Sequence, residues 1–264
     1  MNSIIWVNCK IYGKDEMIRM VEFVSKNMKG LMPLSGEERS MLVEYAEKNG
    51  YMVGQMISVR NQIKIQREIF RSRIFKNRQD KIKQDFIDAV NKGTDIRVFM
   101  ERSRMSVPML IKLIKKVPEF KMLRTRDIDY IDKISLVIQR QETNSRIRAQ
   151  DFENELADFL RVSYKIPFRT ENDIRRDGDY TVTPDILFDY DIDLRVDGID
   201  YKVRWLDAKN YILVDVPFIL KSLKKQADKY NEIFGMGAFV FGYGYDKSIK
   251  IPGTIMLDAS FLKS

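Results

Sequence analysis

The sequence of 264 residues contains no histidine and a single cysteine, Cys9. Without histidine the chain cannot form a Ser-His-Asp triad, use a histidine general base or bind zinc through imidazole groups. One cysteine permits no intramolecular disulfide and cannot supply the thiolates of a structural zinc site, and it favours an intracellular protein. Any catalysis must therefore rest on carboxylates, lysine, tyrosine or a hard metal ion.

The sequence also lacks the features of membrane proteins and of nucleotide-binding loops. No stretch approaches the ~18 consecutive apolar residues of a membrane-spanning helix, and residues 1–10 lack the basic start and long apolar core of a signal peptide. There is no Gly-rich loop of the kind that cradles nucleotide phosphates. We expect an intracellular protein, nuclear or cytoplasmic, that does not associate with membranes.

Charge is unevenly distributed along a chain whose composition is typical of a globular protein. Hydrophobic residues make up 44% of the sequence and charged residues 32%, and the net charge is +8. Residues 1–150 contain 30 Lys and Arg against 18 Asp and Glu, whereas residues 151–264 contain 16 against 20. The asymmetry predicts a basic region that binds polyanions, joined to a more acidic region with a different role. The alternative is an ordinary solvated basic surface.

Residues 1–120 are predicted to be helical and to form a basic DNA-binding domain. Apolar positions over 15–28 recur at helical spacing, and Ser35 with Glu38 forms a capping-box pattern that begins another helix. Residues 60–83 are strongly basic but keep an apolar side, which predicts one or two helices with a cationic outer face. The candidate DNA contacts on this face are Arg71, Arg73 and Lys76.

Residues 85–117 have the spacing of a helix-turn-helix. A helix ends near Gly93, Thr94 is positioned to cap a second helix, and Ser106 is positioned to cap a third. An ordinary helical hairpin packed on its neighbours explains the same spacing equally well. Residues 121–149 are predicted to be a charged helical connector, with the domain boundary near its end. The third helix would present three further candidate DNA contacts, Lys112, Lys115 and Lys116.

From residue 150 the pattern changes to that of a mixed α/β domain, which extends to residue 264. Periodicity predicts helices over 150–164 and 217–234, the second ended by Gly235. This order of helices and strands predicts a mixed sheet flanked by helices. Short apolar or alternating segments are predicted as strands at 166–168, 184–188, 201–209, 238–243 and 254–257.

Two acidic residues and a lysine are predicted to meet at one edge of this sheet. Pro184 suits the first residue of a strand, so that Asp185 projects from the strand mouth. Asp207 and Lys209 lie two residues apart on a later strand and therefore share one face. Glu153, on the preceding helix, is a third candidate carboxylate.

This set of residues suits phosphodiester hydrolysis without histidine. Two carboxylates can hold a hard divalent ion such as Mg²⁺, and a lysine can orient or deprotonate water or stabilise developing negative charge. Short patterns of this kind also arise by chance, in which case Asp185, Asp207 and Lys209 are surface residues at strand ends.

Five segments resemble, in order and spacing, the TPD branch of the PD-(D/E)xK nucleases, which includes the codanin-interacting nuclease and its archaeal and viral relatives. They are residues 180–187, 196–199, 205–209, 226–235 and 237–244. The resemblance implies a restriction-endonuclease-like core, a Mg²⁺ or Mn²⁺ ion and a DNA substrate. It also implies that Asp185, Asp207 and Lys209 are catalytic and that Gln226 and Tyr230 form an accessory helix motif.

The chain departs from the family pattern at two places. Relatives have Glu-Ser-Lys where this chain has Asp207-Ala208-Lys209; aspartate fits the wider motif, and the Ala208 carbonyl can still bind a metal. The helix carboxylate is either Glu153, which fits a Phe-Glu pattern, or Glu155 in a shifted register, and Glu153 is preferred. The predicted metal ligands are Asp185, Asp207, Ala208 and Glu153.

The sequence therefore predicts a Mg²⁺- or Mn²⁺-dependent nuclease that hydrolyses DNA phosphodiester bonds, branched or structured DNA included. The alternative is a catalytically silent DNA-binding or partner-docking protein that retains the nuclease fold. The intact Asp185, Asp207 and Lys209 favour the enzyme. Nucleases of this fold often pair to cut two strands, which leaves a homodimer open, and the resemblance leaves a protein partner open.

Overall fold

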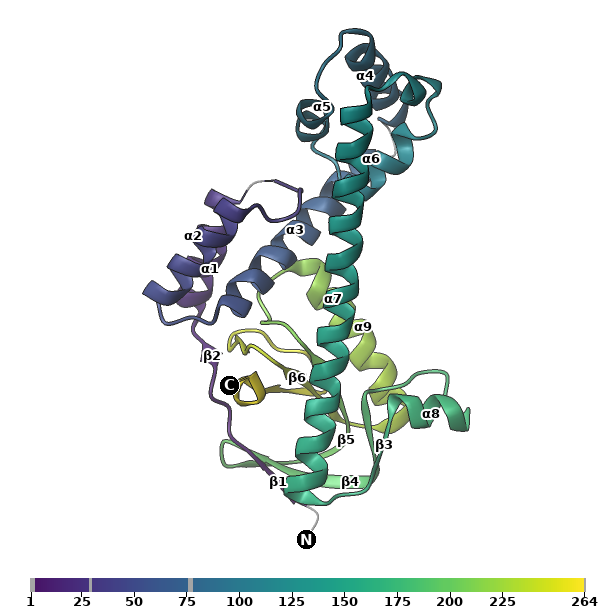
Figure 1. The fold of residues 1–264 in the computed structure, drawn as a ribbon. Coiled ribbons are helices and arrows are strands. Elements are labelled where there is room, and N and C mark those ends of the chain that lie inside the picture. The colour runs from purple at the N-terminus through teal and green to yellow at the C-terminus, as the bar shows by residue number, and fades with distance from the viewer. Residues whose placement is uncertain (1–2, 29, 76–77, 264) are drawn as a thin grey trace.

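The computed structural model describes residues 3–28, 30–75 and 78–263. At its centre is a mixed sheet in the order β1-β4-β5-β6-β8, with β3 also paired to β4 (Figure 1). β4 is antiparallel to β3 and β5, whereas the β1–β4, β5–β6 and β6–β8 pairs are parallel. The strands of this sheet are β1 (Ser3–Trp6), β3 (Phe168–Thr170), β4 (Ile186–Val196), β5 (Ile199–Lys209), β6 (Gly237–Phe241) and β8 (Thr254–Asp258).

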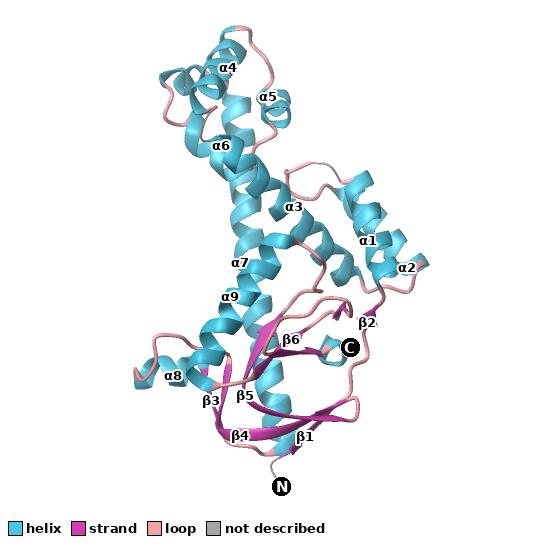
Figure 2. Ribbon diagram, turned by 180° about the vertical axis from the view of Figure 1, so that it is seen from behind, coloured by secondary structure: helices cyan, strands magenta, loops and turns pink. Residues whose placement is uncertain are grey.

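Two long helices, α7 (Thr125–Tyr164) and α9 (Pro217–Phe234), cover opposite faces of the sheet (Figures 1 and 2). Side chains alternate along a strand, so neighbouring residues enter different cores. Phe188 packs with residues of α7, whereas Leu187 and Trp205 pack with residues of α9. The predicted mixed α/β sheet flanked by helices is confirmed.

The predicted helical N-terminal region is also confirmed, and it has two separate cores. Helices α1, α2 and α3 pack together and against the segment 212–216 that follows β5. Helices α4, α5 and α6 pack around Phe86 and onto Ile131 of α7, at the upper end of Figure 1. The helices are α1 (Lys14–Asn27), α2 (Gly36–Lys48), α3 (Val53–Phe75), α4 (Gln79–Asn91), α5 (Ile96–Ser103), α6 (Val107–Ile114) and the short 3-10 helix η1 (Pro118–Met122).

The prediction of helix is wrong for residues 3–12, which contain two short strands, β1 and β2 (Ile11–Tyr12), and no helix. In β1, buried Ile4 and Trp6 alternate with Ile5, which is 62% exposed. A period of two belongs to a strand with one covered face, and β1 lies alongside β4. β2 (Ile11–Tyr12) pairs in the same way with β7 (Tyr245–Asp246). Residues 3–12 are thus part of the α/β unit and not of the helical region.

The helix starts follow the sequence patterns in part. Ser35 and Glu38 form the predicted capping box of α2. Thr94 is not the cap of α5, because Asp95 occupies that position and its Oδ1 accepts the Arg97 N–H at 2.9 Å. Ser106 precedes α6 at the N-cap position without a side-chain hydrogen bond to the helix. Three short consecutive helices result, which suits a helix-turn-helix and a simple helical hairpin alike.

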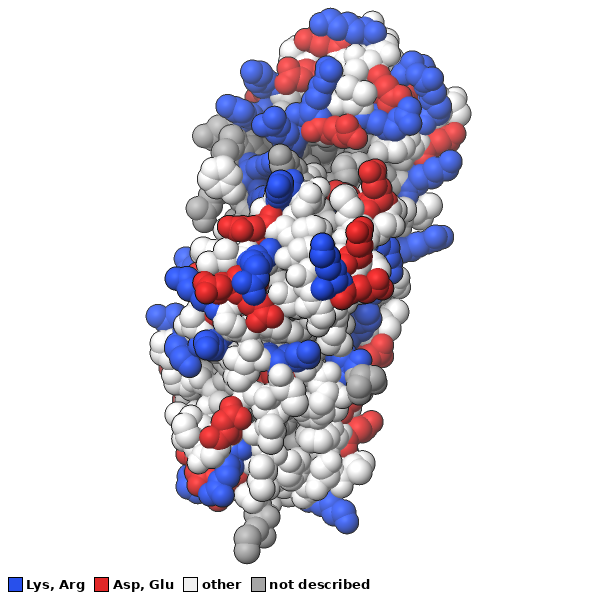
Figure 3. All heavy atoms as spheres, turned by 90° about the vertical axis from the view of Figure 1, so that its left-hand side faces the viewer, with Lys and Arg blue, Asp and Glu red and all other residues white. Residues whose placement is uncertain are grey.

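The predicted cationic face over residues 60–83 is partly internal. Arg60 is only 6% exposed and donates to the Met32 carbonyl at 2.6 Å, so it stabilises the fold. Arg71 donates to the Arg104 carbonyl at 3.1 Å, while Lys76 and the side chain of Arg73 lie outside the described residues. Figure 3 shows Lys and Arg side chains gathered over the upper end of the molecule, where α4 to α6 lie. The exposed lysines there include Lys112, Lys115 and Lys116.

Helix α7 is continuous over 40 residues and passes without a break through the predicted boundary near residue 150. Its first part packs among α4 to α6 through Ile131, and its last part packs on the sheet through Phe152 and Leu156. The helix therefore belongs to both parts of the molecule. None of the described helices combines the length and the apolar composition that crossing a bilayer requires.

Asp258, the last residue of β8, is fully buried and binds the segment that contains β1 and leads to β2. Its Oδ2 accepts the backbone N–H groups of Cys9 and Lys10 at 3.0 and 2.8 Å. Its own N–H donates to Asn8 Oδ1 at 2.7 Å, and its carbonyl accepts the Trp6 indole N–H at 2.8 Å. One residue thus joins the two ends of the chain.

We predict that Asp258→Ala destabilises the protein by roughly 2–3 kcal/mol, because it leaves several partly buried N–H groups without an acceptor. Urea denaturation measures the change. The matched control is Asp193→Ala on β4, which removes an exposed ion pair with Lys202 and should have little effect. Equal midpoints for the two variants would show that Asp258 does not anchor the N-terminal strands.

Candidate active site

Asp185 lies directly before β4, and Asp207 lies near the end of β5. The antiparallel register pairs Ile186 with Leu206, so its continuation sets Asp185 opposite Asp207. Asp185 Oδ2 accepts the N–H of Ala208 at 2.7 Å, which fixes the carboxylate against β5. The strand pairing therefore brings together two acids that are separated by about twenty residues of sequence.

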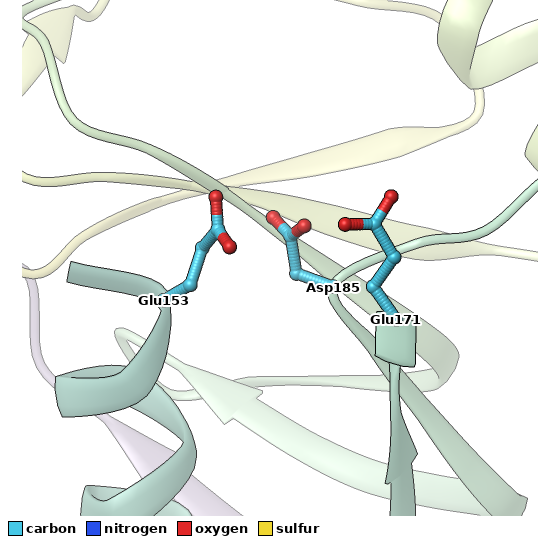
Figure 4. Close-up of side chains that lie close together, drawn as sticks. All are labelled: Glu153, Glu171 and Asp185. Carbon is cyan, nitrogen blue, oxygen red and sulfur yellow. The ribbon is translucent and has the colours of Figure 1, made fainter. Parts of the chain in front are cut away.

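Three carboxylates converge at this point from three different elements (Figure 4). Glu153 comes from α7, Glu171 is the first residue of α8 (Glu171–Asp177), and Asp185 precedes β4. Each offers an oxygen atom, and these oxygens all lie within 4.8 Å of one another. A cluster of this kind, half-buried and built from oxygen donors, suits a hard divalent cation.

Burial and crowding raise the pKa values of two of these carboxyl groups. Burial, followed by the negative charges of Asp207 and Glu153, raises the pKa of Asp185 to about 8. Burial, followed by the charges of Glu171 and Asp207, also raises the pKa of Glu153. Both shifts mean that the ionised cluster is destabilised unless positive charge enters it. The donor set and its electrostatics therefore both fit a bound cation.

Asp207 and Lys209 form an ion pair between Oδ1 and Nζ on the same face of β5. Asp207 is only 2% exposed. Burial is the largest single effect on Lys209 and lowers its pKa, but the charges of Asp207, Tyr211 and Asp185 and the hydrogen bond to Asp207 together raise the pKa overall. The lysine is thus a protonated group held next to the carboxylates.

A chain of hydrogen bonds from α9 holds Asp207 in place. Gln226 Nε2 lies 2.9 Å from Asp207 Oδ2 and 2.9 Å from the hydroxyl oxygen of Tyr230, one helical turn away. The Tyr230 hydroxyl donates to the Thr183 carbonyl at 3.0 Å. Thr183 Oγ1 in turn donates to Glu171 at 3.0 Å. The chain connects β5, α9, the segment before Asp185 and the start of α8.

The structure brings the predicted residues Glu153, Asp185, Asp207, Lys209, Gln226 and Tyr230 to one place. Of the two helix glutamates, Glu155 instead pairs with Lys263 at 3.3 Å. The backbone N–H of Ala208 contacts Asp185.

Glu171 was not predicted, although the sequence carries a signal for it. Thr170 and Asp173 form a capping box, which predicts a helix start and places Glu171 in its first turn. That a carboxylate at this helix start faces Asp185 depends on the pairing of β3 with β4, which is not a local property of the sequence.

Comparison with known proteins matches residues 121–260 to a family described as protein of unknown function TPD sequence-motif. The matched range includes all of the site residues described above. The chain is also similar to uncharacterized protein L539 of Acanthamoeba polyphaga mimivirus, with 34% identity over 265 residues, which is 98% of this chain and 96% of the relative. No solved structure matches the chain.

We predict that Asp185→Asn stabilises the metal-free protein at alkaline pH. A carboxyl group with a folded-state pKa of about 8 and an unfolded-state pKa of about 3.9 holds its proton more tightly in the folded state. The stability that it contributes is therefore present below the unfolded pKa and is lost as the pH rises through the folded one. An asparagine cannot ionise but can still accept the Ala208 N–H.

Thermal unfolding in chelator across this pH range tests the prediction. The variant should unfold at a higher temperature than the parent above pH 8, by roughly 2–4 °C for each kcal/mol of unfavourable ionisation avoided, and the difference should shrink towards pH 4. Asp189→Asn, an exposed position on β4, is the control and should track the parent. If the difference in unfolding temperature between the variant and the parent does not change with pH, then the pKa of Asp185 is not raised in the folded state.

Proposed function

The chain belongs to the TPD sequence-motif family, and we propose that it is a metal-dependent nuclease that hydrolyses DNA phosphodiester bonds. The observation that carries the proposal is the convergence of Glu153, Glu171 and Asp185 near the ion pair of Asp207 and Lys209. A mixed sheet with a helix on each face also supports a restriction-endonuclease-like core of the PD-(D/E)xK type. DNA is proposed as the substrate on the family resemblance.

The donor set suits Mg²⁺ or Mn²⁺, which prefer carboxylate and carbonyl oxygens. Glu153, Glu171 and Asp185 would hold the ion, because each offers an oxygen to the same small volume. Asp207 and the Ala208 carbonyl are the further ligands that the sequence predicts, and the charge of Asp207 already acts on Asp185. When bound, the ion would neutralise charge on a phosphate and make a water molecule easier to deprotonate.

Lys209 is proposed to stabilise the negative charge that develops on the phosphate during hydrolysis. Its raised pKa keeps the ammonium group protonated, because Asp207, Tyr211 and Asp185 together outweigh the effect of burial. A protonated lysine donates hydrogen bonds and cannot accept a proton. The charge balance therefore supports charge stabilisation, and not general-base catalysis, as the role of Lys209.

Gln226 and Tyr230 are proposed as positioning residues. Gln226 donates to Asp207 and thereby fixes the orientation of its carboxylate. Burial, followed by the charge of Asp207, raises the pKa of Tyr230, so its hydroxyl stays protonated and continues to donate to Thr183. Both residues act through Asp207 and the Thr183–Asp185 segment.

A catalytically silent DNA-binding or partner-docking protein could share this fold. Such a protein would have no need for a buried Asp–Lys pair beside three facing carboxylates, because that arrangement is electrostatically costly without a cation. The enzyme is therefore the stronger proposal. Incubation of the purified protein with plasmid and branched DNA, with and without Mn²⁺, distinguishes the two.

We predict that Asp185→Asn, Asp207→Asn and Lys209→Ala each lower the rate of Mn²⁺-dependent cleavage by at least about 10²-fold, because each removes a charge at the proposed reaction centre. Quantified cleavage of labelled DNA measures the rate. Circular dichroism should show a fold like that of the parent for each variant.

The control for these variants is Asp189→Asn, which removes an exposed carboxylate from β4 without touching the site. Its cleavage rate should equal that of the parent. Near-normal cleavage by any one of the three site variants would show that the substituted residue is not catalytic. Normal cleavage by all three would overturn the nuclease proposal at this site.

We predict that DNA affinity depends on the exposed lysines in and directly after the last turn of α6. Neutralising Lys112, Lys115 and Lys116 to alanine should weaken binding and flatten the dependence of log K on log salt by up to ~0.9 for each DNA phosphate that the protein no longer neutralises. Titrations of labelled DNA at several salt concentrations measure both quantities. At saturating DNA, cleavage should persist because α6 packs in a core separate from that of the sheet and lies at the other end of the molecule (Figure 1).

A control with the same change of charge replaces Lys14, Lys26 and Lys48, which are exposed on α1 and α2. This variant should bind DNA more tightly than the α6 variant does. An unchanged affinity and salt slope in the α6 variant would rule out α6 as a DNA contact and would leave the plain helical hairpin as the interpretation of residues 85–117.

A further inference from the structure

A groove of about 540 Å³ adjoins the proposed catalytic site. Helices α3, α7 and α9 form its walls, and Lys209 and Gln226 are among its lining residues, so the groove and the site share residues. A hollow within the range of roughly 300–1,000 Å³ can receive a small organic group. The substrate strand is therefore the natural source of its occupant.

The lining of the groove suits a nucleobase better than a phosphate backbone. Lys209 and Arg148 are the charged residues among the described side chains that line it. The others are apolar, aromatic or neutral hydrogen-bonding groups, among them Ser58, Asn61, Ser145, Asn210 and Ser222. Phosphates attract clustered lysine and arginine, whereas a base binds through an aromatic or apolar platform with neutral polar partners.

Phe218 provides such a platform. It lines the groove, and it remains 49% exposed although phenylalanine is usually covered by its own protein. Residues 218, 222 and 226 are spaced by four and so lie on one face of α9. That face runs from Phe218 to Gln226, which contacts Asp207. A ring stacked on Phe218 would therefore belong to the stretch of substrate beside the reaction centre.

Cations flank the groove on the same helix. Lys225 and Lys229 follow Ser222 and Gln226 by three residues, which makes them neighbours on the helix surface. Both are exposed, and neither has an acidic partner within ion-pair distance in the described part of the chain. This arrangement offers phosphate contacts outside the groove and a base contact within it.

We propose that the groove between α3, α7 and α9 receives one unpaired nucleobase of the substrate strand, stacked on Phe218, while Lys225 and Lys229 contact the adjoining phosphates. The inference rests on the proposed nuclease function. A base within a duplex is paired and stacked, so it can enter only if it is single-stranded or turned out of the helix. The preferred substrate is then DNA with an unpaired nucleotide next to the cut.

Fluorescence of 2-aminopurine tests this inference without cleavage. The Asp185→Asn protein is titrated with a duplex that contains one unpaired 2-aminopurine and with the matched fully paired duplex. We expect the fluorescence to be quenched on binding of the first DNA, because the base stacks on a ring. Phe218→Ala in this background should abolish the quenching and weaken binding of the unpaired substrate by about 5- to 150-fold, with little change for the paired duplex.

Two further variants separate stacking from general apolar contact. Phe218→Leu keeps apolar bulk without a ring and should not show the quenching. Ile233→Ala, 44% exposed on α9 and outside the groove lining, should behave like the parent. Quenching that survives Phe218→Ala would show that the base stacks elsewhere and would overturn the inference. An equal loss of affinity for both DNAs would also overturn it and would point to a backbone phosphate as the occupant.

The outcome is independent of the nuclease test. One possible result is quenching that depends on Phe218, combined with no DNA cleavage by the parent protein in Mn²⁺. This result would support the base-binding groove and contradict the proposed enzyme. Cleavage by the parent, without quenching or preference for the unpaired substrate, would support the enzyme and overturn the groove.

Discussion

Repulsion among closely placed carboxylates is the constraint to which the rest of the site responds. Burial is the largest cause of the raised pKa values of Glu153 and Asp185, and the charges of neighbouring carboxylates, Glu171, Asp207 and Glu153 among them, raise these values further. The fold offsets this cost with one N–H from Ala208, one amide from Gln226 and the ammonium of Lys209. These contacts fix the acids in place without neutralising the cluster. The site therefore suits a cation, because a cation would remove more repulsion than any hydrogen bond does.

The sheet and its two helices make this arrangement rigid. The β4–β5 register sets Asp185 opposite Asp207, and a helix packs on each face of the strands that carry them. The Gln226–Tyr230–Thr183 connection then ties α9 to the segment before Asp185. Glu153 and Gln226 therefore reach the same strand ends from opposite layers. A small displacement of either helix would change the spacing of the charges, so the packing of the two cores contributes directly to the electrostatics of the site.

The sequence predicted what depends on local pattern. Helix 217–234 has the bounds of α9, since Pro217 suits the first helical turn and Gly235, with a φ of 85°, ends the helix. Asp207 and Lys209 share a face because strand geometry requires it.

The position of Glu171 and the strand β1 were not predicted, because both depend on pairing between distant segments, β3 with β4 and β1 with β4. Arg60 was misassigned because basic composition does not distinguish an exposed guanidinium from one that binds the Met32 carbonyl. The continuity of α7 could be predicted from the sequence, because no glycine or proline occurs between residues 121 and 164.

That continuity has a mechanical consequence for the proposed function. Ile131 of α7 is buried in the core of α4 to α6, and Phe152 of the same helix is buried against the sheet, next to Glu153 of the site. A helix rises about 1.5 Å per residue, so the two anchors are roughly 30 Å apart along one stiff element. Helix α3 provides a second connection, since its early residues pack on the segment that follows β5. DNA bound by the basic α4–α6 end would therefore meet the carboxylates at a fixed distance along the molecule. A change in the position of the carboxylates along the DNA would require the whole protein to move.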